Sequence, residues 1–182
     1  MYYGIDINIE AIFQGNKRFP SSHINLSIGD IEEECLTKIS AMPNPVLFDY
    51  ILLPDVLEHL SNPEKTLKYL KNFLRPEGKI FVSIPNVMNW ILMRDLLLNG
   101  QFTYTDTGLL DSDHKHLFTR NEFILMAKRA EYSVVEALMT DAGKVTDQDT
   151  LDFINRLAEF GQPADDFKAF SYYFVLEHKK ND

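Results

Sequence analysis

The sequence is poor in cysteine and in basic residues. Cys35 is the only cysteine, which excludes an internal disulfide and a cysteine-based metal cluster and fits a reducing compartment. Only 18 Lys and Arg stand against 27 Asp and Glu, and the net charge of −9 repels phosphate backbones and anionic membrane surfaces. We therefore expect neither a nucleic-acid partner nor a membrane partner.

Targeting segments and linkers are missing as well. The first residues lack the cationic start and cleavage site of a signal peptide, and no apolar run approaches the ~20 residues of a membrane span. These absences predict a cytoplasmic protein. Internal repeats and linkers rich in Pro, Gly or Ser are also absent, so residues 1–182 are expected to form a single domain with a sizeable core.

Short apolar runs alternate with helical patterns along the chain. The runs predict strands at Tyr2–Ile7, Ile24–Ile28, Leu47–Leu53, Lys79–Ile84, Tyr132–Leu138 and Tyr172–Glu177. The helical patterns lie after Asn8, from Asn62 to a stop at Arg75–Gly78, at Asn86–Leu98, after Thr119 and at Thr150–Phe160. Such alternation indicates an α/β fold with a mostly parallel sheet, in which ligands bind at the carboxyl ends of the strands.

Two stretches carry a family resemblance. "FDYILLPDVLEHLSNPEKTLKYLKNFLRPEGKIFVSIPN", Phe48–Asn86, gives a strand, "DVLEHL", a Pro-started helix, "RPEGK", a strand and "PN" in order. "TGLLDSDHKHLFTRNEF", Thr107–Phe123, gives an "LLD, His, aromatic, FTR" segment. Both resemble the class I S-adenosylmethionine-dependent methyltransferases, the second in particular a bacterial subgroup. "GIDINIEAI" and "GDIEE" are similar to the second and third strand regions of that family.

The resemblance spans almost the whole chain but not the first strand and Gly-rich loop of the family. It implies a Rossmann-like methyltransferase fold that is amino-terminally truncated, with a cofactor half at 1–86 and a substrate side with closing strands at 87–182. Whether Met1 is the native start stays open. We expect the sheet to lack its central strand, so that Tyr2–Ile7 is displaced, pairs with another copy as a homo-oligomer, or closes onto Leu47–Leu53.

The resemblance implies S-adenosylmethionine as cofactor and S-adenosylhomocysteine as product. The cofactor-binding candidates are Asp6, Ile7, Asp30, Ile31, Leu53, Pro54 and Asp55. Asp6 would accept hydrogen bonds from the ribose hydroxyls, or simply lie near a helix start, where the dipole favours an acidic residue. Asp30 would hold the adenine amino group with the help of Ile31, or serve as an ordinary turn aspartate. Leu53 and Pro54 would line the cleft or belong to the core.

Histidines are the candidate catalytic residues. A helix starting near Asp55 would place Asp55, Glu58 and His59 on one face at the mouth of the cleft. A hydroxyl that accepts a methyl group must lose its proton, and a neutral histidine can take it. His59, and His114 from the long loop, are the candidate bases, against surface or loop-packing roles. The expected reaction is O-methylation of a small molecule or of a sugar or glycan precursor.

Other interpretations of these residues stay open. Two carboxylates and two histidines can bind a divalent metal, as in the small-RNA 2′-O-methyltransferases and ubiquinone-pathway O-methyltransferases, whose E-x-x-E-H pattern is similar. Asp55 replaces the first glutamate and shortens the reach, so metal binding ranks below proton transfer. The main functional alternative is a non-catalytic truncated domain that acts as a binding or interaction module. A nicotinamide-dependent oxidoreductase ranks last, because it needs the missing glycine turn.

Overall fold

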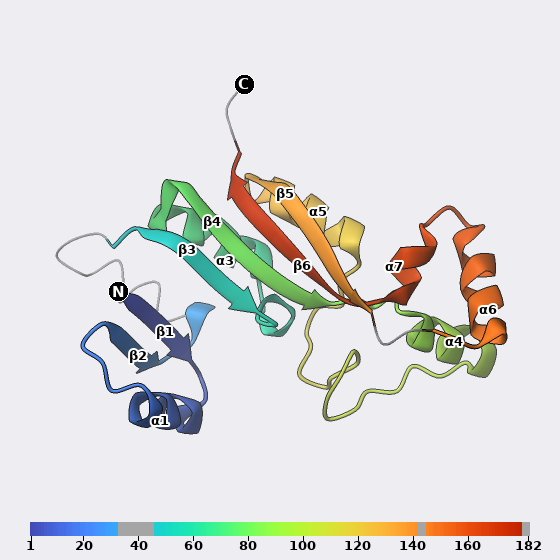
Figure 1. Ribbon diagram of the computed structural model, residues 1–182, viewed down its shortest axis with the longest axis horizontal. Coiled ribbons are helices and arrows are strands. Elements are labelled where there is room, and N and C mark those ends of the chain that lie inside the picture. The colour runs from blue at the N-terminus through green and yellow to red at the C-terminus, as the bar shows by residue number, and fades with distance from the viewer. Residues whose placement is uncertain (33–45, 142–144, 180–182) are drawn as a thin grey trace.

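The computed structural model describes residues 1–32, 46–141 and 145–179, so Cys35 lies outside the described residues. The described strands are β1 Tyr2–Asp6, β2 Ile24–Ile28, β3 Phe48–Pro54, β4 Leu74–Pro85, β5 Tyr132–Asp141 and β6 Ala169–His178. The α-helices are α1 Ile9–Arg18, α3 Pro63–Leu70, α4 Trp90–Asn99, α5 Arg120–Arg129, α6 Gln148–Ala158 and α7 Ala164–Lys168. Short 3₁₀ turns occupy Leu57–His59 and Lys71–Phe73. The elements follow one another as in an α/β domain (Figure 1).

The strands form two separate sheets. A four-stranded sheet has the order β3-β4-β6-β5, in which β3 and β4 are parallel and the pairings of β6 with β4 and β5 are antiparallel. A two-stranded parallel sheet joins β1 to β2, with Tyr2 opposite Ile24 and Asp6 opposite Ile28. The predicted strand positions are confirmed to within a few residues at most ends, and β4 begins five residues before the expected Lys79.

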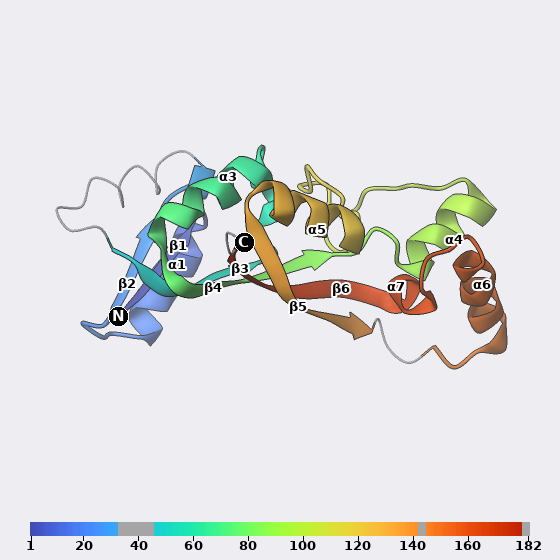
Figure 2. The ribbon, with the colours of Figure 1, turned by 90° about the horizontal axis from the view of Figure 1, so that it is seen from above.

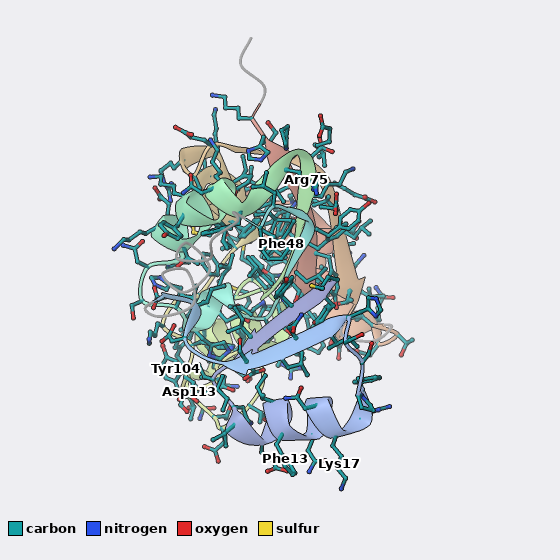
Figure 3. The ribbon with its side chains drawn as sticks, turned by 90° about the vertical axis from the view of Figure 1, so that its left-hand side faces the viewer. Phe13, Lys17, Phe48, Arg75, Tyr104 and Asp113 are labelled. Atoms are coloured by element: carbon teal, nitrogen blue, oxygen red, sulfur yellow. The ribbon has the colours of Figure 1, made fainter. Side chains whose placement is uncertain are left out.

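The sheet is split between β1 and β3. Within the described ranges these two strands belong to different sheets, and the aromatic rings of Tyr3 and Phe48 meet edge to face with centroids 5.6 Å apart. β1 therefore does not close onto β3, and the strand is displaced, which is one of the expected outcomes. Figure 3 shows the pair β1-β2 with α1 beside it, and Phe13 and Lys17 pointing away from the strands.

One face of the four-stranded sheet carries the core. Helices α3 and α5 lie over this face (Figure 2), and Phe123 of α5 stacks on Phe174 of β6 with centroids 4.2 Å apart. The other face is apolar and exposed; strand register and alternation place on it Tyr50, Leu52, Phe81, Leu138 and Tyr173. A second, smaller core forms at the end of the molecule that contains α4, α6 and α7, around Ile154, Leu157 and Phe167.

Caps explain where the helices begin. The side chains of Asn8, Asn62 and Thr119 accept hydrogen bonds from backbone N–H groups in the first turns of α1, α3 and α5, as the sequence predicts. Helix α4 starts at Trp90 and not at Asn86. The side-chain amides of the buried Asn86 and Asn89 both donate to the carbonyl oxygen of Ala169. These bonds attach the segment before α4 to the start of β6, and the helix begins only after it.

The helix ends a few residues before the predicted stop at Arg75–Gly78. Helix α3 ends at Leu70, a 3₁₀ turn comes next, and β4 already begins at Leu74, so Arg75–Gly78 lies inside that strand. Leu74 pairs with Phe48, and the register then shifts before Tyr50 pairs with Lys79. Gly78 fits this irregular segment because a Cβ there would lie only 2.7 Å from Cδ1 of Leu74.

Among the helices of the described ranges, none has both the length and the apolar character of a membrane span.

Candidate functional site

The turn after β3 is pinned to β4. Asp55 has a φ of 48°, a left-handed conformation that aspartate tolerates better than most residues. Its backbone N–H donates to Oγ of Ser83 over 2.9 Å, and that hydroxyl donates to Oδ1 of Asp55 over 2.7 Å. The carboxylate of Asp55 is therefore held toward β4, directly after the buried Leu53 and the exposed Pro54.

The expected helix starting near Asp55 is wrong. The left-handed conformation of Asp55 is incompatible with a helix that starts there. The next element is a single 3₁₀ turn, Leu57–His59, and its Leu57 is fully buried in the core. Consequently Asp55, Glu58 and His59 do not share one helical face. Asp55 is exposed and bonded to Ser83, Glu58 is completely buried, and His59 is half-buried.

The long loop before α5 brings His114 onto His59. The centroids of the two imidazole rings are 4.8 Å apart in an edge-to-face arrangement. Nδ1 of His59 lies 3.2 Å from the carbonyl oxygen of Asp113, and Nδ1 of His114 lies 3.3 Å from that of Leu109. Because a carbonyl only accepts hydrogen bonds, we assign the proton of each neutral ring to Nδ1, which leaves the lone pair on Nε2. In this neutral tautomer, Nε2 of either ring can accept a proton.

Backbone contacts fix this loop against the 3₁₀ turn. The carbonyl oxygen of Glu58 accepts hydrogen bonds from the N–H groups of Lys115, at 2.8 Å, and His116, at 3.0 Å. The ammonium group of Lys115 donates to Oγ of Ser61 over 3.1 Å. Asp113 comes from the same loop and is labelled in Figure 3 together with Tyr104. The histidine pair therefore depends on contacts between segments that are 54 residues apart in the sequence.

Glu58 is the unexpected member of the site. Its side chain is 0% exposed, and neither carboxylate oxygen has a hydrogen-bond partner among the described residues. Burial raises the pKa of this carboxyl to about 7, and the nearby negative charge of Asp55 adds to the effect. One carboxylate oxygen of Glu58 and one ring nitrogen each of His59 and His114 lie within 4.8 Å of one another. The sequence placed Glu58 beside His59 but contains no signal that it is buried.

Asp6 and Asp30 occupy equivalent turns after β1 and β2. Oδ1 of Asp6 accepts from the N–H of Asn8 over 2.8 Å, and Oδ1 of Asp30 accepts from the N–H of Glu32 over 2.7 Å. The N–H of Gly29 donates to the carbonyl of Asp6, which places the two turns side by side. Both aspartates are exposed, so their ligand roles stay predictions beside the turn roles that the structure describes.

The two isoleucines that follow these aspartates differ. The side chain of Ile7 is 76% exposed, whereas Ile31 packs against the main core. Sequence reasoning did not single out Glu32, whose carboxylate oxygens accept from the N–H groups of Ser61 and Asn62, both over 2.7 Å. Partial burial by itself would raise the pKa of the Glu32 carboxyl, but these hydrogen bonds stabilise the ionised form and hold the pKa below its usual range. Glu32 thereby ties the turn after β2 to the start of α3.

Comparisons with known proteins agree with this architecture. Residues 1–137 match the family model described as "Methyltransferase domain". Over 83 residues, the chain is 31% identical to the ubiquinone biosynthesis O-methyltransferase of Glaesserella parasuis serovar 5 (strain SH0165), a match that covers 46% of this chain and 35% of that protein. The match thus spans about a third of the length of that curated relative.

Solved structures show the same fold. A SAM-dependent methyltransferase from Archaeoglobus fulgidus aligns with a TM-score of 0.61 at 14% identity, covering 96% of this chain and 74% of that one. The N-methyltransferase NodS from Bradyrhizobium japonicum WM9, in complex with S-adenosyl-L-homocysteine, aligns with a TM-score of 0.56 at 16% identity, covering 98% and 66%. The expected Rossmann-like α/β fold is confirmed by these likenesses.

Proposed function

Because this chain belongs to the methyltransferase domain family, we propose that it is the catalytic part of an S-adenosylmethionine-dependent O-methyltransferase acting on a small molecule or a sugar or glycan precursor. The observation that carries the proposal is the contact between His59 and His114, whose rings are 4.8 Å apart just beyond the carboxyl end of β3. In an open α/β sheet, ligands bind at that end of the strands.

The cofactor assignment is supported by the position of the acidic turns. Asp6 and Asp30 follow the ends of two neighbouring parallel strands, and the Gly29 N–H bond to Asp6 holds the two turns together. A carboxylate with two oxygens suits a ribose diol, and a second one suits an exocyclic amino group. S-adenosylmethionine, when bound, supplies the methyl group and leaves as S-adenosylhomocysteine. NodS, a structural neighbour, was solved with that product.

The histidines would manage the proton of the acceptor. As the carbon–oxygen bond to the methyl group forms and the carbon–sulfur bond breaks, the hydroxyl proton moves to Nε2 of His59 or His114. In the tautomer with the proton on Nδ1, the carbonyls of Asp113 and Leu109 accept a hydrogen bond from each ring and orient both rings. A positioned base of this kind contributes roughly 10²–10⁴-fold to the rate.

The test uses a version of the protein that also carries an amino-terminal strand and a Gly-rich loop. His59→Ala and His114→Ala are compared with the parent in turnover across pH 6 to 9, with the exposed His23→Ala as the matched control. We expect one of the two site variants to lose roughly 10²–10⁴-fold in turnover at an unchanged melting temperature, and His23→Ala to match the parent. If both site variants stay within a few-fold of the parent while folded, neither histidine is the base.

A specific observation favours a second function, that of an interaction module. β1 and β3 present edges that are not paired with each other, and the exposed sheet face carries Leu52 and Tyr173. A non-catalytic domain that contacts another polypeptide or a second copy of itself would use these surfaces. Sedimentation across a concentration series, together with the turnover assay, separates the two: association without any methyl transfer supports the module.

A further inference from the structure

We propose that Glu32 is a positioning residue that couples the adenine side of the cofactor site to the histidine pair. It holds the turn after β2, which contains Asp30, against the segments that supply His59 and His114. The inference rests on the proposed function, because it takes Asp30 to face the cofactor and the histidines to face the acceptor. It names a residue outside both sets as the connection between them.

The carboxylate of Glu32 bridges the two parts of the split sheet. Within residues 1–32, 46–141 and 145–179, β1 and β2 pair with each other and with no strand of the four-stranded sheet. The two carboxylate oxygens of Glu32 accept hydrogen bonds from the N–H groups of Ser61 and Asn62, both over 2.7 Å. Two parallel bonds to a charged acceptor fix direction as well as distance, so Glu32 orients the turn after β2 relative to the start of α3.

The backbone of Glu32 is fixed by the acidic turns themselves. Its N–H donates to Oδ1 of Asp30 over 2.7 Å, and the N–H of Gly29 donates to the carbonyl oxygen of Asp6 over 3.1 Å. Ile31, the residue between Asp30 and Glu32, packs against the main core. A ligand held by the two aspartates would therefore restrict the segment from which the Glu32 side chain projects.

Ser61 continues the connection to both histidines. It follows His59 by two residues, and its backbone N–H donates to Glu32. Its hydroxyl oxygen accepts from the ammonium group of Lys115 over 3.1 Å, and Nε2 of His116 lies 3.4 Å from its carbonyl oxygen. Lys115 and His116 directly follow the second histidine of the pair in the sequence. A displacement of Ser61 therefore acts on both segments that form the pair.

The bridge needs the ionised form of Glu32. Partial burial raises the pKa of this carboxyl, but the hydrogen bonds from Ser61 and Asn62 and the positive charge of Lys115 outweigh burial and hold the pKa below its usual range. The ionised carboxylate accepts from both N–H groups. Glutamine has nearly the same shape but offers one oxygen and one NH₂ group, so Glu32→Gln leaves one of the two N–H groups facing a donor. The substitution breaks the bridge with little change in volume.

The experiment titrates residues 1–182 with adenosine and follows the imidazole C–H signals by nuclear magnetic resonance. Adenosine carries the adenine and ribose that the acidic turns would hold, and it lacks the methionyl part that extends toward the acceptor. In the wild type, we expect adenosine to shift the signals of His59 and His114 in parallel with the amide signal of Gly29, which reports binding at the turns. In Glu32→Gln, adenosine should bind within about threefold of the wild-type affinity, while the histidine shifts fall at least threefold.

A second measurement needs no ligand. Hydrogen exchange at the N–H groups of Lys115 and His116, which bond to the carbonyl of Glu58 and not to Glu32, should be at least tenfold faster in Glu32→Gln, with exchange in β4 and β6 unchanged. The matched control is Glu10→Gln, because Glu10 is an exposed glutamate of α1 beside the same two strands; it should behave as the wild type in both measurements.

The outcomes separate the coupling from the proposed function. A Gly29 shift without histidine shifts in the wild type, histidine shifts that persist in Glu32→Gln, or unchanged exchange at Lys115 and His116 overturns the coupling and leaves methyl transfer as proposed. If adenosine shifts neither Gly29 nor the histidines in the wild type, the cofactor assignment of the acidic turns is wrong, and the coupling is wrong with it.

Discussion

Replacing Glu58 with glutamine should stabilise the protein, by an amount that grows with pH. Burial raises the pKa of this carboxyl from 4.5 to about 7 in the folded protein. Between these values the folded state binds more protons at this site than the unfolded state does, so stability falls as pH rises. Glutamine has almost the same shape and does not titrate, and the difference between the two proteins isolates the carboxyl.

The magnitude is set by the size of the shift. Each pKa unit corresponds to about 1.36 kcal/mol, and the stability advantage of Glu58→Gln should increase by about 2.5 kcal/mol between pH 5 and pH 8. Because the carboxyl is fully buried, solvent screening reduces this number little. The change should flatten above pH 7, where Glu58 has become ionised in both the folded and the unfolded state.

Urea unfolding at half-unit steps from pH 5 to pH 8, in the presence of a chelator, provides the measurement. The exposed Glu159→Gln serves as the matched control and should stay parallel to the wild type. A difference between wild type and Glu58→Gln that varies by less than about 0.5 kcal/mol over this range would refute the reasoning on burial.

Two further predictions concern the core and the cofactor turn. Phe123→Ala should lower the free energy of unfolding by about 3–5 kcal/mol, because it removes a fully buried ring that stacks on Phe174. Leu98→Ala, at a 66% exposed position, should change the melting temperature little. Equal effects of the two in thermal melts would contradict the core assignment. Calorimetry with S-adenosylhomocysteine should show that residues 1–182 bind it more weakly than low micromolar, because no two glycines of this sequence lie within two residues of each other, as a Gly-rich turn requires. Asp6→Ala should abolish the remaining binding. An unchanged isotherm would contradict the assignment of Asp6 to the ribose.

Local signals were sufficient for most of the secondary structure. A cap such as Asn62 or Thr119 acts on N–H groups two or three residues away, so it can be read from the sequence, and both helices begin where these residues predict. The segment Arg75–Gly78 misled the interpretation because Pro and Gly are also tolerated in an irregular strand. Its residues have no partners in β3, but the pairs Leu74–Phe48 and Lys79–Tyr50 on either side of it, which no local pattern reveals, place it inside the strand.

Contacts between distant segments decided the site. The sequence placed His59 and His114 among the candidates, but the 4.8 Å contact between their rings depends on a loop anchored to the carbonyl of Glu58. The complete burial of Glu58 depends in turn on the left-handed turn at Asp55, which replaces the expected helix by one 3₁₀ turn. In this turn Asp55 therefore contacts Ser83, Glu58 is buried, and His59 meets the loop.

Apart from α7 and the turn after β3, the sequence by itself determined the order of the described strands and helices, the caps and the positions of the acidic residues at strand ends, because each depends on residues within one or two turns of chain. Only the tertiary structure decided that the sheet is divided between β1 and β3, that one sheet face stays exposed, and that Glu58 is enclosed without a partner in the described part of the chain. Pairing and burial are properties of segments brought together from far apart, and the free energy of those contacts is set by neighbours that a linear pattern does not identify.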